Sequence, residues 1–316
     1  MKKIFVFLYL LVVQGCKVQD TLVLELKEPK LILNAILIAN ETPSIYVGKA
    51  FAPTGKIPID HFIDNALVIL YENDKPIEKL THSKNGIYAL SNYAIKANRF
   101  YQFRVKASGY LDAQNIPVLI PQNAEISSVN FDNKTDYPTL NNNAKGRLLS
   151  VNLSDSLKEE YYGLGFKKSK NGANVSGNVY PIEIGTTSLS KLNTDCYKWF
   201  VLADNVDYSL DRKPFDSIIL YSASCFGKMK KMGIVVDTYG TVQIPDKNGS
   251  YYSSQIDRLE ATIATFSEEY FIYSKNIKVL QGIDNAFFEP QRVYSNVVNG
   301  YGVVVAMNRK TVVFNL

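Results

Sequence analysis

The sequence predicts a mainly β protein: an antiparallel β-sandwich of the Ig-like or transthyretin-like kind, followed by a second β-rich domain with one amphipathic helix. The 21 tyrosines and 16 phenylalanines favour strands over helices. Short apolar runs recur about every ten residues between turns rich in Asn, Asp, Gly and Pro. In residues 101–106, aromatic or apolar side chains alternate with polar ones, which is the period of a strand with one buried face.

Residues 30–131 are predicted to form the β-sandwich domain. Its expected strands are residues 30–38, 45–51, 66–71, 77–80, 87–90 and 101–107. Residues 132–146, rich in Asn and Asp, are predicted to be a linker or a long surface loop. Residues 147–316 form the predicted C-terminal domain. Its expected strands are residues 148–153, 161–166, 217–222, 233–236, 259–266, 302–307 and 311–314.

One helix is predicted over residues 267–281. Apolar side chains recur at steps of four and three residues, so they share one helical face; they are Phe266, Tyr270, Tyr273, Ile277 and Leu280. Ser267 is a suitable N-cap, and the acids Glu268 and Glu269 suit the first turn. We interpret the aromatic stripe as packing against a sheet rather than as a ligand site.

The N-terminus has the pattern of an export signal. Lys2 and Lys3 precede ten apolar residues, 4–13, which is too short for a permanent membrane span of about 20 residues. Val13-Gln14-Gly15 followed by Cys16 resembles the lipobox of bacterial lipoproteins. This resemblance implies a signal peptide over residues 1–15, acylation of Cys16 and a lipidated leader over residues 16–29. The alternative is an ordinary secretory signal with an incidental cysteine.

The charge of the chain does not favour nucleic acid as a partner. Loss of Lys2 and Lys3 with the signal lowers the formal charge from +5 to +3, because residues 1–15 hold no acid. The short basic cluster at 228–231 is better explained as a solvated turn. Since no later segment approaches membrane-spanning length, we expect a soluble body tethered by lipid alone.

Two cysteines remain beside the predicted lipid attachment site, Cys196 and Cys225. A disulfide between them would suit an oxidising compartment and would contribute roughly 3 kcal/mol on the chain-entropy model. Two buried free thiols are the alternative, and the sequence does not decide between them.

No catalytic, metal or cofactor site is predicted. His61 and His82 are not near a cysteine or a cluster of acids with metal-ligand spacing. Ser224 lacks the first glycine of a nucleophile elbow, and a catalytic histidine would have to come from the other predicted domain.

Two glycine pairs and one acidic stretch are also better explained structurally. Gly163-Leu164-Gly165 and Gly300-Tyr301-Gly302 lack the continuation of a phosphate-binding loop, so turn or close-packing glycines are expected. The acidic stretch Asp204, Asp207, Asp211 and Asp216 lacks calcium-loop spacing and is interpreted as a solvated loop.

Three stretches together carry a family resemblance. They are Pro29 to Asn34; the set Asn65 to Glu72, Asn85 to Tyr88 and Tyr101 to Tyr110; and the C-terminal set Ser267 to Tyr273, Phe287 to Pro290 and Val293 to Gly302. The chain resembles the DUF4249 lipoproteins of Bacteroidota, a family of unknown function. It departs from the family pattern at Asn299, where a second glycine is usual, and near Val305, where an aromatic is common.

The resemblance implies an outer-membrane lipoprotein, often encoded beside a TonB-dependent transporter, and supplies no catalytic residues. The favoured hypothesis is a non-enzymatic, lipid-anchored accessory or lid partner of such a β-barrel in nutrient uptake. Candidate contact loops are residues 53–62 and 204–215. The Lys17 to Asp20 stretch is weakly similar to surface-export signals, so the cell surface is favoured over the periplasmic face. The alternatives are a structural or envelope-assembly accessory, and an extracellular hydrolase with two acids about 5–10 Å apart.

Overall fold

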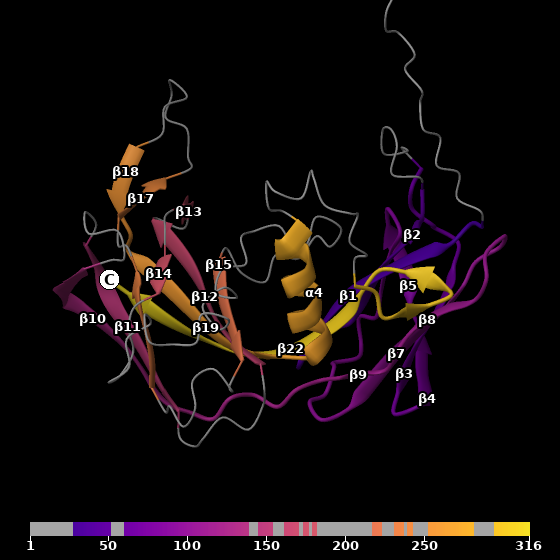
Figure 1. Cartoon of the computed structure of the whole chain (residues 1–316), viewed down its shortest axis with the longest axis horizontal. Helices are drawn as coiled ribbons and strands as arrows, with labels where there is room; N and C mark the ends of the chain where they lie inside the picture. The colour runs from indigo at the N-terminus through magenta and orange to yellow at the C-terminus, as the bar shows by residue number, and fades with distance from the viewer. Residues whose placement is uncertain are drawn as a thin grey trace, which may run out of the picture.

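The computed structural model describes residues 28–51, 60–138, 145–153, 161–170, 173–176, 179–181, 217–222, 231–236, 239–242, 252–280 and 294–316. These residues are mainly in β-strands, most of them in antiparallel pairs, which confirms the predicted fold class. Figure 1 shows two β-rich halves with the helix α4 (Glu268–Leu280) standing between them.

The described strands form three sheets. The largest has the order β18 (Tyr252–Gln255), β17 (Tyr239–Val242), β13 (Ala173–Ser176), β12 (Tyr161–Lys170), β19 (Arg258–Phe266), β22 (Val304–Asn315), β1 (Leu31–Ile38), β2 (Ser44–Lys49), β6 (Ile87–Ala89) and β5 (Thr81–Lys84). Two more strands of this sheet lie outside that order: β15 (Ser217–Ser222) pairs with β12, and β21 (Gly300–Tyr301) pairs with β1. The second has the order β10 (Ile126–Pro138), β11 (Lys145–Leu153), β16 (Lys231–Val236) and β14 (Val179–Pro181). The third has the order β20 (Val297–Val298), β8 (Ala113–Asn115), β7 (Phe100–Lys106), β3 (Leu67–Glu72) and β4 (Lys75–Lys79), with β9 (Val118–Leu119) paired to β7.

The N-terminal half is a two-layer sandwich. Alternating side chains of β1 and β2 in one layer share a single buried cluster with those of β3 and β7 in the other. Val68 and Leu70 of β3 and Phe103 of β7 are fully buried in this cluster. The period-two pattern of residues 101–106 therefore marks the inner face of β7, as predicted.

β1 is buried on both faces from Ala35 to Ile38, whereas Ile32 and Asn34 on one face are half-buried; this burial explains its almost continuous apolar sequence. Leu33 and Leu37 point into the sandwich core, whereas Ile36 and Ile38 belong to a second cluster with Phe266 and Tyr270 near α4. The strand thus lies between two separate cores. If one of its faces were polar, one of these cores would lack apolar side chains from β1.

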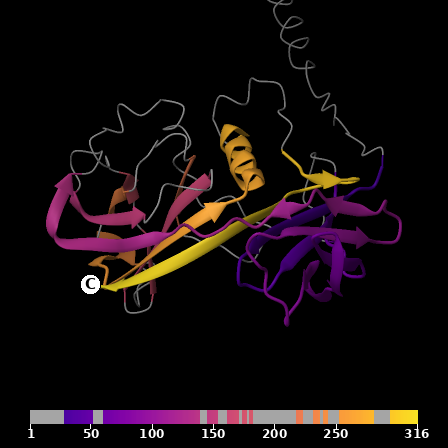
Figure 2. The same cartoon turned by 90° about the horizontal axis from the view of Figure 1, so that it is seen from below.

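β22 joins the two halves of the chain. Its first part pairs in parallel with β1, from Ala35 opposite Val304 to Ile38 opposite Met307. From Met307 to Asn315 it pairs antiparallel with β19. Figure 2 shows this strand running from the sandwich across to the other half. The two predicted domains therefore share one sheet, and their division into two independent units stays a prediction.

The helix α4 confirms the prediction over residues 267–281. The Ser267 Oγ accepts from the Tyr270 backbone N–H at 3.4 Å, as an N-cap does, and also from the Ala306 N–H at 3.1 Å. Glu268 and Glu269 lie in the first turn. Phe266 and Tyr270 are in the core, so this part of the stripe packs against the sheet as expected.

Two segments differ from their predicted form. Residues 132–138 complete β10 and residues 145–146 begin β11, so this much of the expected linker is strand; residues 139–144 lie outside the described residues. The expected strands at 302–307 and 311–314 are one strand, β22. In both places the strand continues because it is paired with a distant strand, β11 at Asp132, Tyr137 and Pro138 and β19 along residues 307–315, and local composition does not reveal that pairing.

Candidate functional site

A cavity of about 780 Å³ opens between β1, the middle of α4 and residues 294–302. Its volume is within the range of small-molecule sites. Its polar and aromatic lining consists of Asn34 from β1, Tyr273 and Asn276 from α4, and Tyr294, Ser295 and Tyr301 from the C-terminal segment. We call this cavity the tyrosine pocket. Ile32 and Val297 add apolar surface to it.

Two asparagines attach the C-terminal segment to the rest of the pocket wall. Tyr273 and Asn276, three residues apart, lie on one face of α4. The Asn276 Oδ1 accepts from the Tyr294 backbone N–H at 2.7 Å. The Asn34 Oδ1 accepts from the Val303 backbone N–H at 3.0 Å. The segment is therefore held to the helix at one end and to β1 at the other.

The glycines of this segment allow close backbone packing. A Cβ on Gly302, whose φ is +107°, would lie 2.2 Å from the Leu33 carbonyl oxygen, and a Cβ on Gly300 would lie 2.8 Å from that of Leu31. Gly300-Tyr301-Gly302 is thus a packing element, as predicted, and not a phosphate loop. Asn299 has a φ of 57°, a conformation that Gly and Asn tolerate best. This explains how Asn299 replaces the glycine usual in the resembled family.

In the part of the chain that the structure describes, the residues that line the tyrosine pocket carry no formal charge. Charges of both signs lie around it. The Lys30 Nζ is 5.1 Å from the centroid of the Tyr301 ring. Burial raises the pKa of Tyr294, and the nearby Glu269 and Glu268 raise it further, so this phenol is neutral at physiological pH. The pocket therefore offers aromatic faces, amides and hydroxyls to a ligand.

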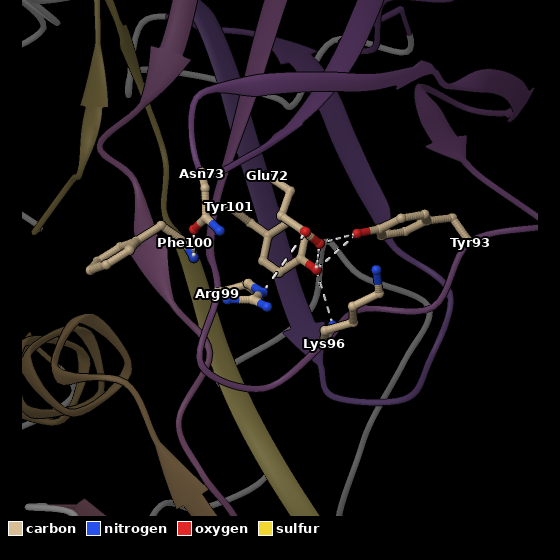
Figure 3. Close-up of polar contacts among 7 residues, drawn as sticks. All are labelled: Glu72, Asn73, Tyr93, Lys96, Arg99, Phe100 and Tyr101. Carbon is tan, nitrogen blue, oxygen red and sulfur yellow. Dashed lines mark hydrogen bonds and ion pairs between the residues drawn. The ribbon is translucent and has the colours of Figure 1, made fainter.

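A second polar cluster surrounds Glu72 at the end of β3 (Figure 3). The Tyr101 hydroxyl donates to the Glu72 Oε2 at 2.6 Å, and the Tyr93 hydroxyl donates to the same oxygen. The Lys96 backbone N–H donates to the Tyr101 Oη at 3.0 Å. The Arg99 Nε lies 4.0 Å from the Glu72 Oε1. The cluster holds residues 93–99 against the start of β7.

The Glu72 cluster is a structural unit rather than a reactive one. Burial alone would raise the pKa of Glu72, but the hydrogen bonds from Tyr101 and Tyr93 outweigh it and hold the pKa below its ordinary value. Burial and the Glu72 carboxylate raise the pKa of Tyr93 to about 12 and also raise that of Tyr101. A carboxylate kept ionised by two neutral phenols is suited to holding the fold together.

The other candidate site residues that the structure describes make contacts that are typical of a structural role. The His82 Nε2 is 2.8 Å from the Asp64 Oδ1, and the His61 ring packs edge-on against Phe62. Gly163 and Gly165 lie inside β12, between β15 and β19, where they are close-packing strand residues as expected. Within the described ranges, no three His, Cys, Asp or Glu side chains gather to hold a metal ion. None of the described helices is long and apolar enough to cross a bilayer.

Several predicted site residues lie outside the described residues. They are Cys16, Cys196, Cys225, Ser224, the acids Asp204, Asp207 and Asp211 with Asp216, residues 53–59 of the first contact loop and the whole of the second, 204–215. Lipidation of Cys16 and pairing of Cys196 with Cys225 therefore stay predictions.

No pattern in the sequence predicted the tyrosine pocket. Tyr273 was expected to pack in the core, and it contacts the buried cluster near α4 while also facing the cavity. Tyr294 and Tyr301 belong to the segment that carries the family resemblance, but no role was predicted for them. The one available signal was that aromatic and amide side chains are frequent in the sequence between Tyr294 and Tyr301. Only the fold brings these two tyrosines close to Asn34.

The family model named DUF4249, described as a domain of unknown function, matches residues 18–312. No curated protein matches the chain. Among solved structures, a protein from Corynebacterium diphtheriae described as membrane anchored aligns over 75% of this chain and 54% of its own, with 9% identity and a TM-score of 0.20. The chain thus spans about half of that structure, and a likeness this low supports no conclusion on fold or function.

Proposed function

We propose that this chain, which belongs to the DUF4249 family, is a lipid-anchored, non-enzymatic binding protein of the outer membrane. In this proposal it acts as an accessory or lid partner of a TonB-dependent β-barrel transporter in nutrient uptake. The acylated Cys16 is the anchor, and the cell surface is the favoured face of the membrane.

The observation that carries the proposal is the place of the tyrosine pocket in the chain. Ile32 and Asn34 of its wall lie on β1, the first described strand after Cys16. The 15 steps along the chain from Cys16 to Leu31 span at most about 54 Å, at 3.3–3.6 Å per residue. An anchored chain therefore keeps the pocket close to the membrane, within reach of a β-barrel in the same bilayer.

The character of the described polar groups supports binding rather than catalysis. The partly buried carboxylate of Glu72 is engaged by two tyrosine hydroxyls, and the pocket is lined by neutral side chains. Such a lining orients a ligand by hydrogen bonds and aromatic contact. We therefore propose that the protein holds a nutrient or closes over one, and that the transporter moves it.

A co-purification experiment tests the transporter partnership. The lipidated chain, tagged at its C-terminus, is solubilised from its native membrane in mild detergent and purified with its partners. A TonB-dependent β-barrel should be recovered in near-stoichiometric amount. The Cys16→Ser variant, which keeps the same folded body, is the matched control and should recover much less. Recovery of the lipidated chain without any barrel would count against the partnership, and broad loss of outer-membrane proteins in a deletion strain would favour an envelope-assembly role.

A further inference from the structure

We infer that the tyrosine pocket binds a neutral carbohydrate, such as one or two sugar rings of an oligosaccharide. The inference deepens the proposed function by naming the class of the cargo, and it depends on that proposal only for the step from binding to uptake. It is carried by the combination of three tyrosines with two amides and one hydroxyl around a cavity of about 780 Å³.

The aromatic side chains provide the first half of sugar recognition. A sugar ring has apolar faces made of C–H groups, and the negative face of an aromatic ring attracts such groups. Tyr273 and Tyr294 come from two different elements of the pocket lining, α4 and the C-terminal segment. Tyr301 remains 39% exposed and is therefore accessible to a ligand from solvent.

The polar side chains provide the second half. Sugar hydroxyls both donate and accept hydrogen bonds, so they are matched by amides and hydroxyls. The Asn276 Oδ1 is occupied by the Tyr294 backbone N–H, an interaction that fixes the orientation of the amide. The Nδ2 group of Asn276 is therefore the end that donates to a ligand oxygen. Ser295 contributes a hydroxyl to the same cavity.

The neutral character of the described lining argues for a neutral sugar. A carboxylate or phosphate ligand would need a paired cation when it leaves water. The described residues that line this cavity include no Lys, Arg or His. The Lys30 ammonium lies near the Tyr301 ring instead of lining the cavity. A sulfated or uronic-acid sugar is thus disfavoured.

The strand pairing argues against an extended peptide as the ligand. Peptides commonly bind by adding a strand to a free sheet edge. At the pocket, Ile32 of β1 is paired on one side with Gly48 and on the other with Tyr301. Both hydrogen-bonding edges of β1 are occupied there, so the pocket offers side chains rather than a backbone edge.

The test measures binding to the full lipidated chain in a detergent without a sugar headgroup, since a maltoside would compete. The probes are neutral tetrasaccharides of glucose, galactose, mannose and xylose in both anomeric linkages, a tetragalacturonate, and tetra-alanine. Saturation-transfer NMR and titration calorimetry are used at millimolar concentration. We expect at least one neutral tetrasaccharide to bind, and tetragalacturonate and tetra-alanine not to bind.

Two variants place the binding in the pocket. Tyr301→Ala removes an accessible ring, and Asn276→Asp keeps the acceptor for the Tyr294 N–H while removing the Nδ2 donor. Each should weaken binding of the neutral sugar about tenfold. Phe100→Ala removes an aromatic ring on β7 that is 49% exposed and outside the pocket, and it should leave binding unchanged.

The outcomes separate this inference from the proposed function. No binding of any neutral sugar, tighter binding of tetragalacturonate or tetra-alanine, or sugar binding that both pocket variants retain would each overturn the inference. None of these results bears on recovery of a transporter with the lipidated chain. Conversely, sugar binding without a barrel partner would support the inference and contradict the partnership alone.

Discussion

Removal of the Tyr101 hydroxyl tests the structural role of the Glu72 cluster. This side chain is fully buried; its hydroxyl donates to the Glu72 carboxylate at 2.6 Å and accepts from the Lys96 N–H at 3.0 Å. A hydrogen bond to a charged group contributes about 1.5–3 kcal/mol, and a buried donor left without its partner costs about 1–3 kcal/mol. Tyr101→Phe should therefore lower the free energy of unfolding by about 3 kcal/mol. Tyr93→Phe loses one bond to Glu72 and should cost about half as much.

The assay is urea unfolding at pH 7, followed by far-UV circular dichroism and by the near-UV signal of the tyrosines. The pH dependence gives a second readout. Because the folded pKa of Glu72 lies below its ordinary value, its stabilising effect is present above that ordinary value, about 4.3, and is lost as the pH falls through the folded pKa. The difference between wild type and Tyr101→Phe should shrink over this acid range.

At high pH the stability changes in the opposite direction, falling as the pH rises. The pKa of Tyr93 is raised from 10.0 to about 12, so folding loses stability as the pH rises from 10 toward 12, where the unfolded phenol ionises first. Tyr93→Phe should flatten this loss. A Tyr101→Phe variant within about 0.5 kcal/mol of wild type at pH 7, or a difference that stays constant into acid, would refute the assigned role of the cluster.

Three further predictions concern other positions. Cys16→Ser should leave the circular dichroism unchanged and move the protein from the membrane fraction to the soluble fraction; retention after alkaline washing would contradict the lipoprotein assignment. Gly302→Ala should cost at least about 2 kcal/mol in urea unfolding, because φ is +107° and the new Cβ meets the Leu33 carbonyl, and an unchanged midpoint would contradict that packing. Ser267→Ala should cost about 2 kcal/mol in the same assay, since the N-cap bond and the bond from the Ala306 N–H are both lost, whereas Ser267→Thr should restore most of it.

Local patterns predicted the elements whose cause is local. The alternation in residues 101–106 marked the buried face of β7, and the stripe beginning at Phe266 marked α4 with its Ser267 cap. The almost continuous apolar run of β1, interrupted only by Asn34, predicted a strand as well, because a strand covered on both faces has few polar side chains. In each of these cases the residues of one segment are sufficient to predict its secondary structure and its buried face.

Features made by distant pairing were not predictable. β22 is a single strand because Asn308 to Lys310 pair with β19, although these polar residues resemble a break. β10 extends through residues 132–138 because β11 pairs with it at Asp132 and again at Tyr137 and Pro138, on either side of an irregularity in the register. The tyrosine pocket unites β1, α4 and the C-terminal segment, and no single segment shows a ligand-binding pattern.

The most direct test of the central claim is hydrogen–deuterium exchange on the full lipidated chain, with and without the neutral tetrasaccharide that binds best. If the tyrosine pocket holds the sugar, exchange should slow in residues 294–302 and around Tyr273 and Asn276 of α4, and Tyr301→Ala should abolish the effect. Exchange that is unchanged in these segments, or slowed only elsewhere on the chain, would contradict the claim that this pocket is the binding site.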